Sequence, residues 1–221
     1  MNLSKSFEFF DPTKVREKIH IVGCGSVGST IAENLARLGL ENFVLYDFDV
    51  VESHNLVNQM FNQDDIGSPK VEATKKLILK INPEAEPCIK MVPEGWNNQM
   101  LDGYVFLCVD NIDLRREICT KNRGNPLIKC IFDFRTALES AQTYAAEWND
   151  LRQVNNLLKS MDFTHEEAKA VTPVSACGVA LGVAPTVRMV CTVGVCNFMN
   201  YVLGRGIKPI MVCEPFRLEM Y

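Results

Sequence analysis

Short apolar runs alternate with amphipathic stretches over the first part of the chain. The apolar runs end at polar residues or glycine, which predicts β-strands at residues 19–23, 43–47, 88–92, 104–109 and 127–132. The stretches between them predict helices at residues 28–39, 70–81, 97–101 and 112–122. Strands and helices that alternate in this way form a mostly parallel sheet covered by helices. The pattern therefore predicts the α/β class.

The second half of the chain departs from this alternation. Its pattern predicts a strand at residues 141–147, helices at 150–160 and 164–170, and two short terminal strands at 210–213 and 216–220. We interpret this part as an excursion over one edge of the sheet.

The most apolar stretch, residues 179–203, predicts a long C-terminal helix. It is long enough to span a bilayer, but it contains Pro185, Arg188, Asn197 and Asn200. Its flanks also lack the charge asymmetry that is typical of a membrane span. We therefore expect this helix in the protein core or at an interface between two copies of the chain, and we expect no membrane contact.

A glycine pattern follows the first predicted strand. Residues 19–28 read IHIVGCGSVG, and Asp47 lies at the end of the next apolar run. Gly23 would allow a tight turn, Gly25 would let the backbone approach a phosphate, and Gly28 would let the next helix lie close to the sheet. The helix N-terminus would offer free N–H groups to an anion, and Asp47 would bind ribose hydroxyls. This order predicts a Rossmann-like nucleotide-binding unit; the alternative is a tight turn without a ligand.

Composition and charge narrow the class of protein further. The 221 residues are 47% hydrophobic and 23% charged, which predicts one globular domain over residues 19–221 after an N-terminal arm at residues 1–18. The net charge of −4, without a long basic run, argues against a nucleic-acid partner. The first residues lack the apolar core of a secretory signal, so we expect a cytoplasmic protein. Nine scattered cysteines without C-x-x-C spacing predict reduced, mostly buried thiols and no zinc site.

The segment after the second predicted strand carries a longer motif. Residues 47–61 read DFDVVESHNLVNQMF, and residues 66–70 read IGSPK. The fourth predicted strand ends in Cys108-Val109-Asp110-Asn111, and Arg115 follows. These motifs resemble those of the ThiF/MoeB/HesA family, the adenylating relatives of ubiquitin-activating enzymes, and the resemblance extends from about residue 15 to residue 204. It implies a ThiF-type nucleotide-binding domain over residues 19–221.

The resemblance implies an ATP- and Mg²⁺-dependent adenylyltransferase that acts as a homodimer. Its substrate would be the C-terminal carboxylate of a small ubiquitin-like carrier protein or peptide. Because a carboxylate and a phosphate are both anions, cations must offset their charge. Lys70 is the candidate phosphate contact, and Asp110, at the end of a strand, is the candidate Mg²⁺ ligand. Arg115 is a further catalytic candidate, and the other implied nucleotide contacts are Gly23, Gly25, Gly28, Asp47, Asp49, Asn55 and Gln59.

Each assignment has a structural alternative. Lys70 could begin an exposed helix face, Asp110 could cap the following helix, and Asn55 could be a turn residue. Independent preferences of this kind do not produce S-x-N-L-x-x-Q followed by I-G-x-x-K, so the joint pattern favours the functional interpretation.

One residue departs from the family motif, since Asn58 stands where the family has an arginine. An amide cannot neutralise phosphate charge. Either Arg16, Arg115 or an arginine of a second subunit compensates, or the site is slow or inactive. The second interpretation is therefore a nucleotide-binding partner subunit of an active paralogue. The third is an NAD-dependent oxidoreductase, which would leave the S-x-N-L-x-x-Q and G-x-x-K elements without a role.

Cys177, just before the predicted long helix, is the candidate for a thioester-forming nucleophile, because a helix N-terminus lowers a thiol pKa. Its alternative is a small buried residue at a helix start. His54 and His165 are interpreted as solvated side chains.

A charged group follows the fifth predicted strand. Asp133, Arg135 and Glu139 would either bind an incoming peptide tail or form a surface salt bridge.

Overall fold

The computed structural model describes residues 1–176 and 178–220. These residues contain an eight-stranded sheet with the strand order β3-β2-β1-β4-β5-β6-β7-β8. The strands are β1 (Ile19–Val22), β2 (Phe43–Tyr46), β3 (Lys90–Val92), β4 (Gly103–Leu107), β5 (Ile128–Thr136), β6 (Ala141–Glu147), β7 (Ile210–Glu214) and β8 (Glu219–Met220).

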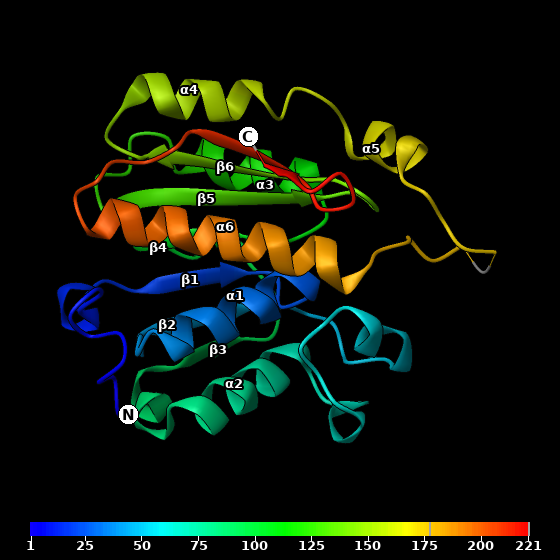
Figure 1. Ribbon diagram of the computed structural model, residues 1–221. Coiled ribbons are helices and arrows are strands. Elements are labelled where there is room, and N and C mark those ends of the chain that lie inside the picture. Colours follow the sequence, from blue (N-terminus) through cyan, green and yellow to red (C-terminus); the bar gives the residue numbers. More distant parts are fainter. Residues whose placement is uncertain (177, 221) are drawn as a thin grey trace.

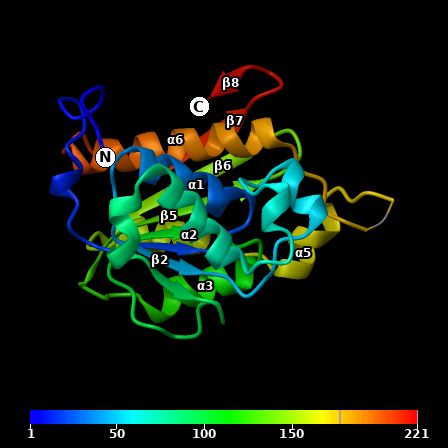
Figure 2. The same cartoon turned by 90° about the horizontal axis from the view of Figure 1, so that it is seen from below.

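Helices cover both faces of this sheet (Figures 1 and 2). The α-helices are α1 (Ser26–Arg37), α2 (Lys70–Ile81), α3 (Ile112–Lys121), α4 (Leu151–Lys159), α5 (His165–Val171) and α6 (Ala184–Val202). Short 3-10 helices are η1 (Pro12–Lys14), η2 (Ser53–Val57), η3 (Gln63–Asp65) and η4 (Pro83–Cys88). Helices α1, α2 and α6 pack on one face, and α3 and α4 pack on the other.

The sheet combines a parallel and an antiparallel part. β1 pairs in parallel with β2 and β4, β2 with β3, and β4 with β5. β6, β7 and β8 then add antiparallel strands beyond β5. This confirms the predicted Rossmann-like α/β fold with a mostly parallel sheet covered by helices. The antiparallel strands form the excursion at the sheet edge that the sequence predicted.

Alternating side chains of the strands form two apolar cores. Ile19 and Ile21 of β1 face the core under α1 and α6, whereas Val22 faces the core under α3 and α4. Phe198 of α6 packs edge-on against Phe106 and Phe132, with ring centroids 5.6 and 5.9 Å apart. Because both faces of the central strands are buried, their sequences read as continuous apolar runs.

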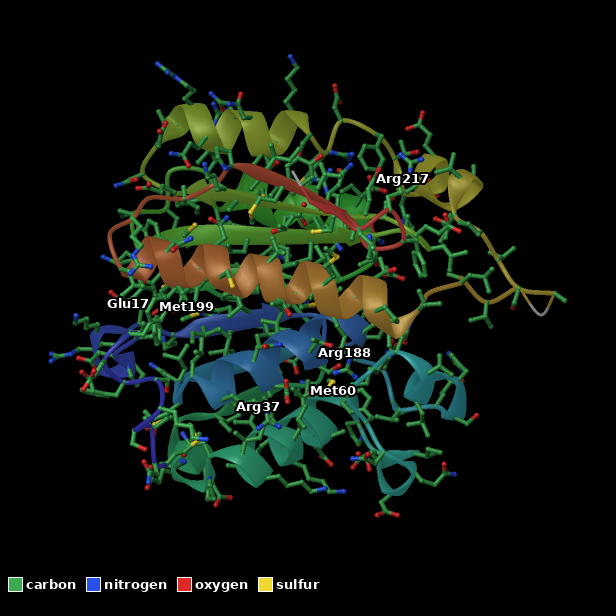
Figure 3. All side chains as sticks on the ribbon, viewed as in Figure 1. Glu17, Arg37, Met60, Arg188, Met199 and Arg217 are labelled. Atoms are coloured by element: carbon green, nitrogen blue, oxygen red, sulfur yellow. The ribbon has the colours of Figure 1, made fainter. Side chains whose placement is uncertain are left out.

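The long C-terminal helix is present, but it begins at Ala184 rather than at residue 179. Pro185 stands in its first turn, where a missing N–H costs no helical hydrogen bond. The helix lies against β5 at Gly194, where a Cβ would come within 2.1 Å of the Phe134 ring. Figure 3 shows Arg188 toward the start of this helix and Met199 toward its other end. Within the described residues, no helix has the length and apolar character needed to cross a membrane.

Two local predictions are corrected. Residues 97–101 form a bend and irregular backbone instead of a helix, and the φ angle of Asn98, 61°, does not occur in a right-handed helix. The last strand covers only Glu219–Met220, after a turn at residues 215–218. The predicted N-terminal arm packs onto the protein, where Phe10 is buried against Phe198.

The turn between β1 and α1 depends on two glycines. Gly23 has a φ of 94°, a conformation that side chains with a Cβ rarely adopt. A Cβ at Gly28 would lie 1.8 Å from the Gly23 carbonyl oxygen. Both predicted roles are confirmed: a tight turn at Gly23 and close packing of the helix at Gly28.

We predict that Gly28→Ala lowers the free energy of unfolding by at least about 2 kcal/mol, because the added methyl group collides with backbone atoms. The measurement is urea denaturation. Gly25→Ala is the matched control, since a Cβ there meets no described atom within 4 Å. Equal stability of the two variants would contradict the steric role of Gly28.

Candidate functional site

A hollow of about 390 Å³ lies at the carboxyl ends of β1, β2 and β4. In parallel sheets this edge is where loops from neighbouring strands meet, and ligands bind there. The lining residues include glycines, acidic residues and aromatic residues. The lining comprises Val22, Gly23, Gly25, Ser26, Tyr46, Asp47, Phe48, Asp49, Gln59, Lys70, Glu94, Gly95, Trp96, Cys108, Val109, Asp110, Asn111, Leu114 and His165.

Asp47 is fixed at the end of β2 by two backbone hydrogen bonds. The Cys24 N–H donates to Oδ2 at 2.6 Å, and the Asp49 N–H donates to Oδ1 at 2.9 Å. Burial raises the pKa of Asp47, although these hydrogen bonds oppose the shift. The carboxylate therefore joins the β2 loop to the glycine loop and borders the hollow.

The hydroxyl group of Tyr46 is held by His20. The His20 Nδ1 atom lies 2.9 Å from the Tyr46 hydroxyl, and His20 Nε2 lies 2.7 Å from Asp102 Oδ1. Burial lowers the pKa of His20 despite the nearby carboxylate. A neutral imidazole can accept a hydrogen bond from the tyrosine while it donates one to the aspartate.

Lys70 is not part of an exposed helix face. It is 8% exposed at the first residue of α2, and its Nζ donates to Asp49 Oδ2 at 2.7 Å. The ion pair places its ammonium group at the hollow, next to Asp47 and Asp49. The structural alternative for Lys70 is therefore wrong.

Asp110 is exposed at the hollow, just after β4. The N-cap of α3 is Asn111, whose Oδ1 accepts from the N–H groups of Asp113 and Leu114 at 2.9 and 3.2 Å. The cap alternative for Asp110 is therefore wrong. Within the described residues, its carboxylate has no hydrogen-bond or ion-pair partner.

The glycine loop presents open backbone to the hollow. A Cβ built on Gly25 would meet no described atom within 4 Å, and Gly25 is also the N-cap of α1. The first N–H groups of α1 lack helical acceptors, which makes this terminus suitable for an anion. Gln59 also lines the hollow, and its Oε1 is buried without a hydrogen-bond partner in the described part of the chain. These features fit a nucleotide with its phosphates at the glycine loop.

The donor set also fits a cation that is carried by a triphosphate. Magnesium binds through one or two carboxylates, with phosphate and water oxygens as its other ligands. Asp110 supplies one such carboxylate. The residues that the structure describes contain no group of three or more His, Cys, Asp or Glu suited to hold a metal ion on their own.

The structure places Asn55 and Asn58 outside the lining of the hollow. Asn55 is buried, and its Oδ1 accepts from the Glu52 N–H at 2.9 Å in a capping box of η2. The Asn58 amide lies near Gly182, where a Cβ would be 3.0 Å from its Nδ2. The turn interpretation of Asn55 is thus confirmed. Asn58 adds no positive charge to the described lining of the hollow.

Arg115 lies behind the hollow in a buried ion-pair network. Its Nη1 donates to Asp133 and to the Phe134 carbonyl, and its Nε donates to the Val109 carbonyl at 2.7 Å. Asp133 is fully buried and also accepts from Arg135 Nε at 2.7 Å. The guanidinium of Arg115 therefore fixes the loop that carries Asp110.

This network also corrects the interpretation of Asp133 and Arg135. Their ion pair is buried, so it is not a surface salt bridge. Arg135 donates to the Ser160 carbonyl and hydroxyl at 2.7 and 2.9 Å. Its guanidinium group, a candidate for binding a peptide carboxylate, is thus already engaged within the protein. Glu139 is exposed.

The remaining candidates lie elsewhere. Arg16 precedes β1, at the edge of the sheet opposite the hollow, and is exposed. Burial raises the pKa of the Cys24 and Cys108 thiols, so they remain protonated and are poor nucleophiles. Cys177 lies outside the described residues.

Sequence reasoning missed several lining residues. Trp96 directly precedes residues 97–101, for which a helix was predicted. It borders the hollow and is 8% exposed. His165 was interpreted as solvated, yet it is half-buried and lines the hollow from α5. The placement of both residues depends on tertiary contacts, so no local pattern marks them.

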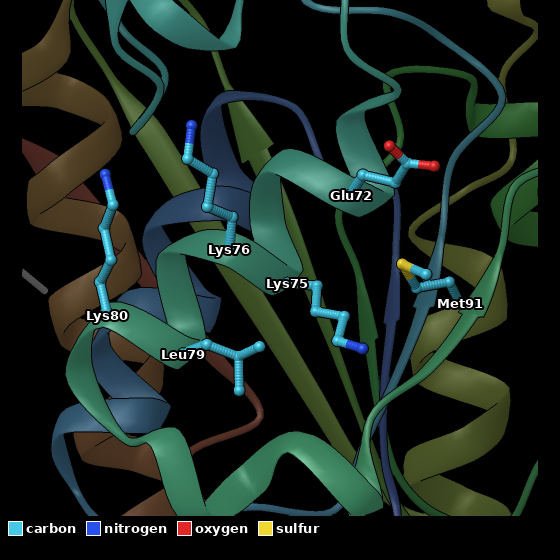
Figure 4. A pocket seen from close by; sticks show the side chains of 6 residues that line it. All are labelled: Glu72, Lys75, Lys76, Leu79, Lys80 and Met91. Carbon is cyan, nitrogen blue, oxygen red and sulfur yellow. The ribbon is translucent and has the colours of Figure 1, made fainter.

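A second hollow lies along α2, away from the strand ends (Figure 4). It is lined by Glu72, Lys75, Lys76, Leu79, Lys80 and Met91. Lys75 pairs with Glu86 at 3.8 Å and Lys76 with Asp65 at 2.6 Å. Because its lysines are partly neutralised and it lacks the glycine loop, the hollow at the strand ends is the better candidate site.

Comparisons with known proteins agree with this geometry. Residues 13–212 match the model of the ThiF family. A ubiquitin-like modifier-activating enzyme 5 of Drosophila virilis is 30% identical over 149 residues, which cover 57% of this chain and 35% of that protein. The enzyme of the same name from Aedes aegypti is 30% identical over 128 residues, covering 48% and 31%. The chain thus spans about a third of the length of the curated relatives it matches.

Solved structures show the same fold. The structure of E. coli MccB with ATP has a TM-score of 0.71 and 17% identity, covering 95% of this chain and 64% of that chain. The structure of PaaA has a TM-score of 0.70 and 16% identity, covering 94% and 64%.

We predict that Arg115→Lys lowers the free energy of unfolding by about 2 to 3 kcal/mol, because a lysine cannot replace the forked bonds to buried acceptors. Urea denaturation checks this loss. Arg37→Lys is the control, since Arg37 forms an exposed pair with Glu33 within one helix. Unchanged stability with a tenfold loss of ATP affinity would instead place the Arg115 guanidinium on the nucleotide.

Proposed function

The chain belongs to the ThiF family, and we propose from this premise that it is an ATP- and Mg²⁺-dependent adenylyltransferase. The observation that carries the proposal is the convergence of four groups at one hollow. These are the open backbone at Gly25, the fixed carboxylate of Asp47, the buried ammonium of Lys70 and the carboxylate of Asp110, which has no partner among the described residues.

Each group has a proposed role in nucleotide binding. Asp47 and Asp49 take the ribose side, and the loop of Gly23, Gly25 and Gly28 takes the phosphates together with the N-terminus of α1. Lys70 contacts a phosphate when the nucleotide enters. Asn55 supports the site through its turn, and the NH2 group of the Gln59 amide donates a hydrogen bond to the triphosphate.

The proposed reaction joins a carboxylate to AMP. A carboxylate oxygen attacks the α-phosphorus, the bond from that phosphorus to the bridging oxygen breaks, and pyrophosphate leaves with the bonding electrons. Negative charge grows on the phosphate oxygens during this step, so donors placed around them accelerate it. Asp110 would hold Mg²⁺, which neutralises phosphate charge when it is bound.

We propose that the carboxylate is the C-terminus of a small ubiquitin-like carrier protein or of a peptide. The name of the modifier-activating relatives supports a protein carrier, and the structure of MccB with the MccA peptide and AMPCPP supports a peptide. The proposal includes a homodimer in the cytoplasm. The outer face of α6, which includes Thr192 and Cys196, is exposed and offers a surface for a second copy.

One observation favours a second candidate function, a nucleotide-binding subunit with little activity of its own. Among the described residues that line the hollow, Lys70 is the single lysine or arginine, and Asn58 does not supply the cation that the family motif provides. Such a subunit would bind ATP and depend on a partner for the missing charge.

Calorimetric titration with ATP and with NAD, each with and without Mg²⁺, tests the proposal. Binding of ATP that Mg²⁺ strengthens, without binding of NAD, would support it, and binding of NAD alone would overturn it. Pyrophosphate exchange into ATP in the presence of candidate carriers then separates the enzyme from the binding subunit.

We predict that Lys70→Met weakens ATP binding about tenfold or more and leaves adenosine binding within about twofold, because only the phosphates lose a charged donor. Calorimetry with both ligands measures the difference. Lys80→Met is the control, since Lys80 lies on the same helix at the second hollow. Equal weakening of ATP and adenosine would contradict the phosphate role.

We predict that Asp110→Asn removes the effect of Mg²⁺ on ATP affinity. The melting temperature should change by less than about 3 °C, because this exposed side chain has no partner within the described residues. Titrations with and without Mg²⁺ measure the effect, and Asp162→Asn, another exposed carboxylate, is the control. A Mg²⁺ effect that persists in Asp110→Asn would exclude this residue as the cation ligand.

A further inference from the structure

The segment that leads into α5 is anchored to the body of the protein by two arginines. Arg116 Nε donates to the Met161 carbonyl at 2.9 Å, and its Nη2 donates to the Phe163 carbonyl. Arg135 holds Ser160 through the carbonyl and the hydroxyl. These bonds fix the backbone immediately before His165.

His165 itself is held by its main chain. Its N–H donates to Asp113 Oδ2 at 3.2 Å, and Asp113 also pairs with Arg116 at 2.9 Å. The residue is therefore positioned from α3, next to the loop that carries Asp110. Its side chain lines the hollow, as do Asp110, Asn111 and Leu114.

The two ring nitrogens of His165 have different surroundings. Nδ1 is buried and has no hydrogen-bond partner in the described part of the chain, whereas Nε2 is not shielded in this way. Nε2 is therefore the ring nitrogen that can meet a ligand, and an N–H at Nε2 is the donor that this imidazole can offer.

The charged side chains that line the hollow are mostly acidic. Its described side chains include four carboxylates, those of Asp47, Asp49, Glu94 and Asp110, against the single ammonium of Lys70. Lys70 already donates to Asp49. A triphosphate adds further negative charge, so Mg²⁺ and additional N–H donors have to compensate.

We propose that His165 is a phosphate-binding residue whose Nε2–H donates a hydrogen bond to the bound nucleotide. The inference rests on the proposed nucleotide-binding function and adds to it a second side-chain donor, besides Lys70, at the lining of the hollow. It also gives the arginine-anchored segment before α5 a role, which is to hold His165 at this lining.

The test is calorimetric titration of the full chain with MgATP and with adenosine. We expect His165→Phe to bind MgATP about tenfold more weakly and adenosine within about twofold of the original chain. His165→Gln places an amide N–H near the position of Nε2 and should restore MgATP affinity to within about threefold. His165→Asn places it near Nδ1 and should not restore it. His54→Asn is the control, because His54 is exposed next to Glu52 at 3.4 Å.

Each outcome decides the inference. A tenfold loss that is specific to MgATP, with rescue by Gln and not by Asn, supports it. Unchanged MgATP affinity in His165→Phe, or equal losses for MgATP and adenosine, overturns it and leaves the proposed function in place. If the unsubstituted chain binds no MgATP, both the inference about His165 and the proposed function are overturned. If His165→Phe has a lowered melting temperature, the comparison of the Gln and Asn variants decides alone.

Discussion

The close approach of α1 to β1 is the contact on which the rest of the architecture depends. A Cβ at residue 28 would lie 1.8 Å from the carbonyl oxygen of Gly23, so only glycine fits at this position. The turn at Gly23 also requires a backbone conformation that favours glycine. With this contact in place, the N-terminus of α1 points its free N–H groups toward the loops after β2 and β4. Asp47 then joins the β2 loop to the glycine loop, so the residues of this turn both stabilise the fold and line the site.

Charge is distributed unevenly between the scaffold and the site. Two arginines, Arg115 and Arg135, bind the buried carboxylate of Asp133 and several carbonyl groups, so their role is to hold loops. Among the charged side chains that line the hollow, four are carboxylates, and Lys70 is the cation that the described lining supplies. A site of this kind suits a ligand that arrives with its own divalent cation, because the cation offsets the repulsion between the carboxylates and the phosphates.

The sequence predicted the parts of the molecule that depend on local rules. The central strands, the helix over Lys70–Ile81, the turn at Gly23 and the packing role of Gly28 follow from apolar periodicity and glycine geometry. What it could not predict depends on contacts between distant segments. Arg115 was a catalytic candidate through the family motif, and its ion pair with Asp133, on the neighbouring strand β5, is unknown until the sheet is assembled. The path that brings His165 to the hollow depends in the same way on Arg116 and Arg135.

The two tryptophans of the chain occupy environments that an optical experiment can separate. Trp96 borders the hollow, and its indole N–H donates to the Gln99 carbonyl at 3.0 Å. Trp148 is buried near the start of β5, at the far edge of the sheet, and donates to the Asn122 carbonyl at 2.7 Å. Intrinsic fluorescence therefore contains one emitter beside the site and one inside the scaffold. Ligand occupancy can be followed through the first while the second serves as an internal reference for the folded state, without any attached dye.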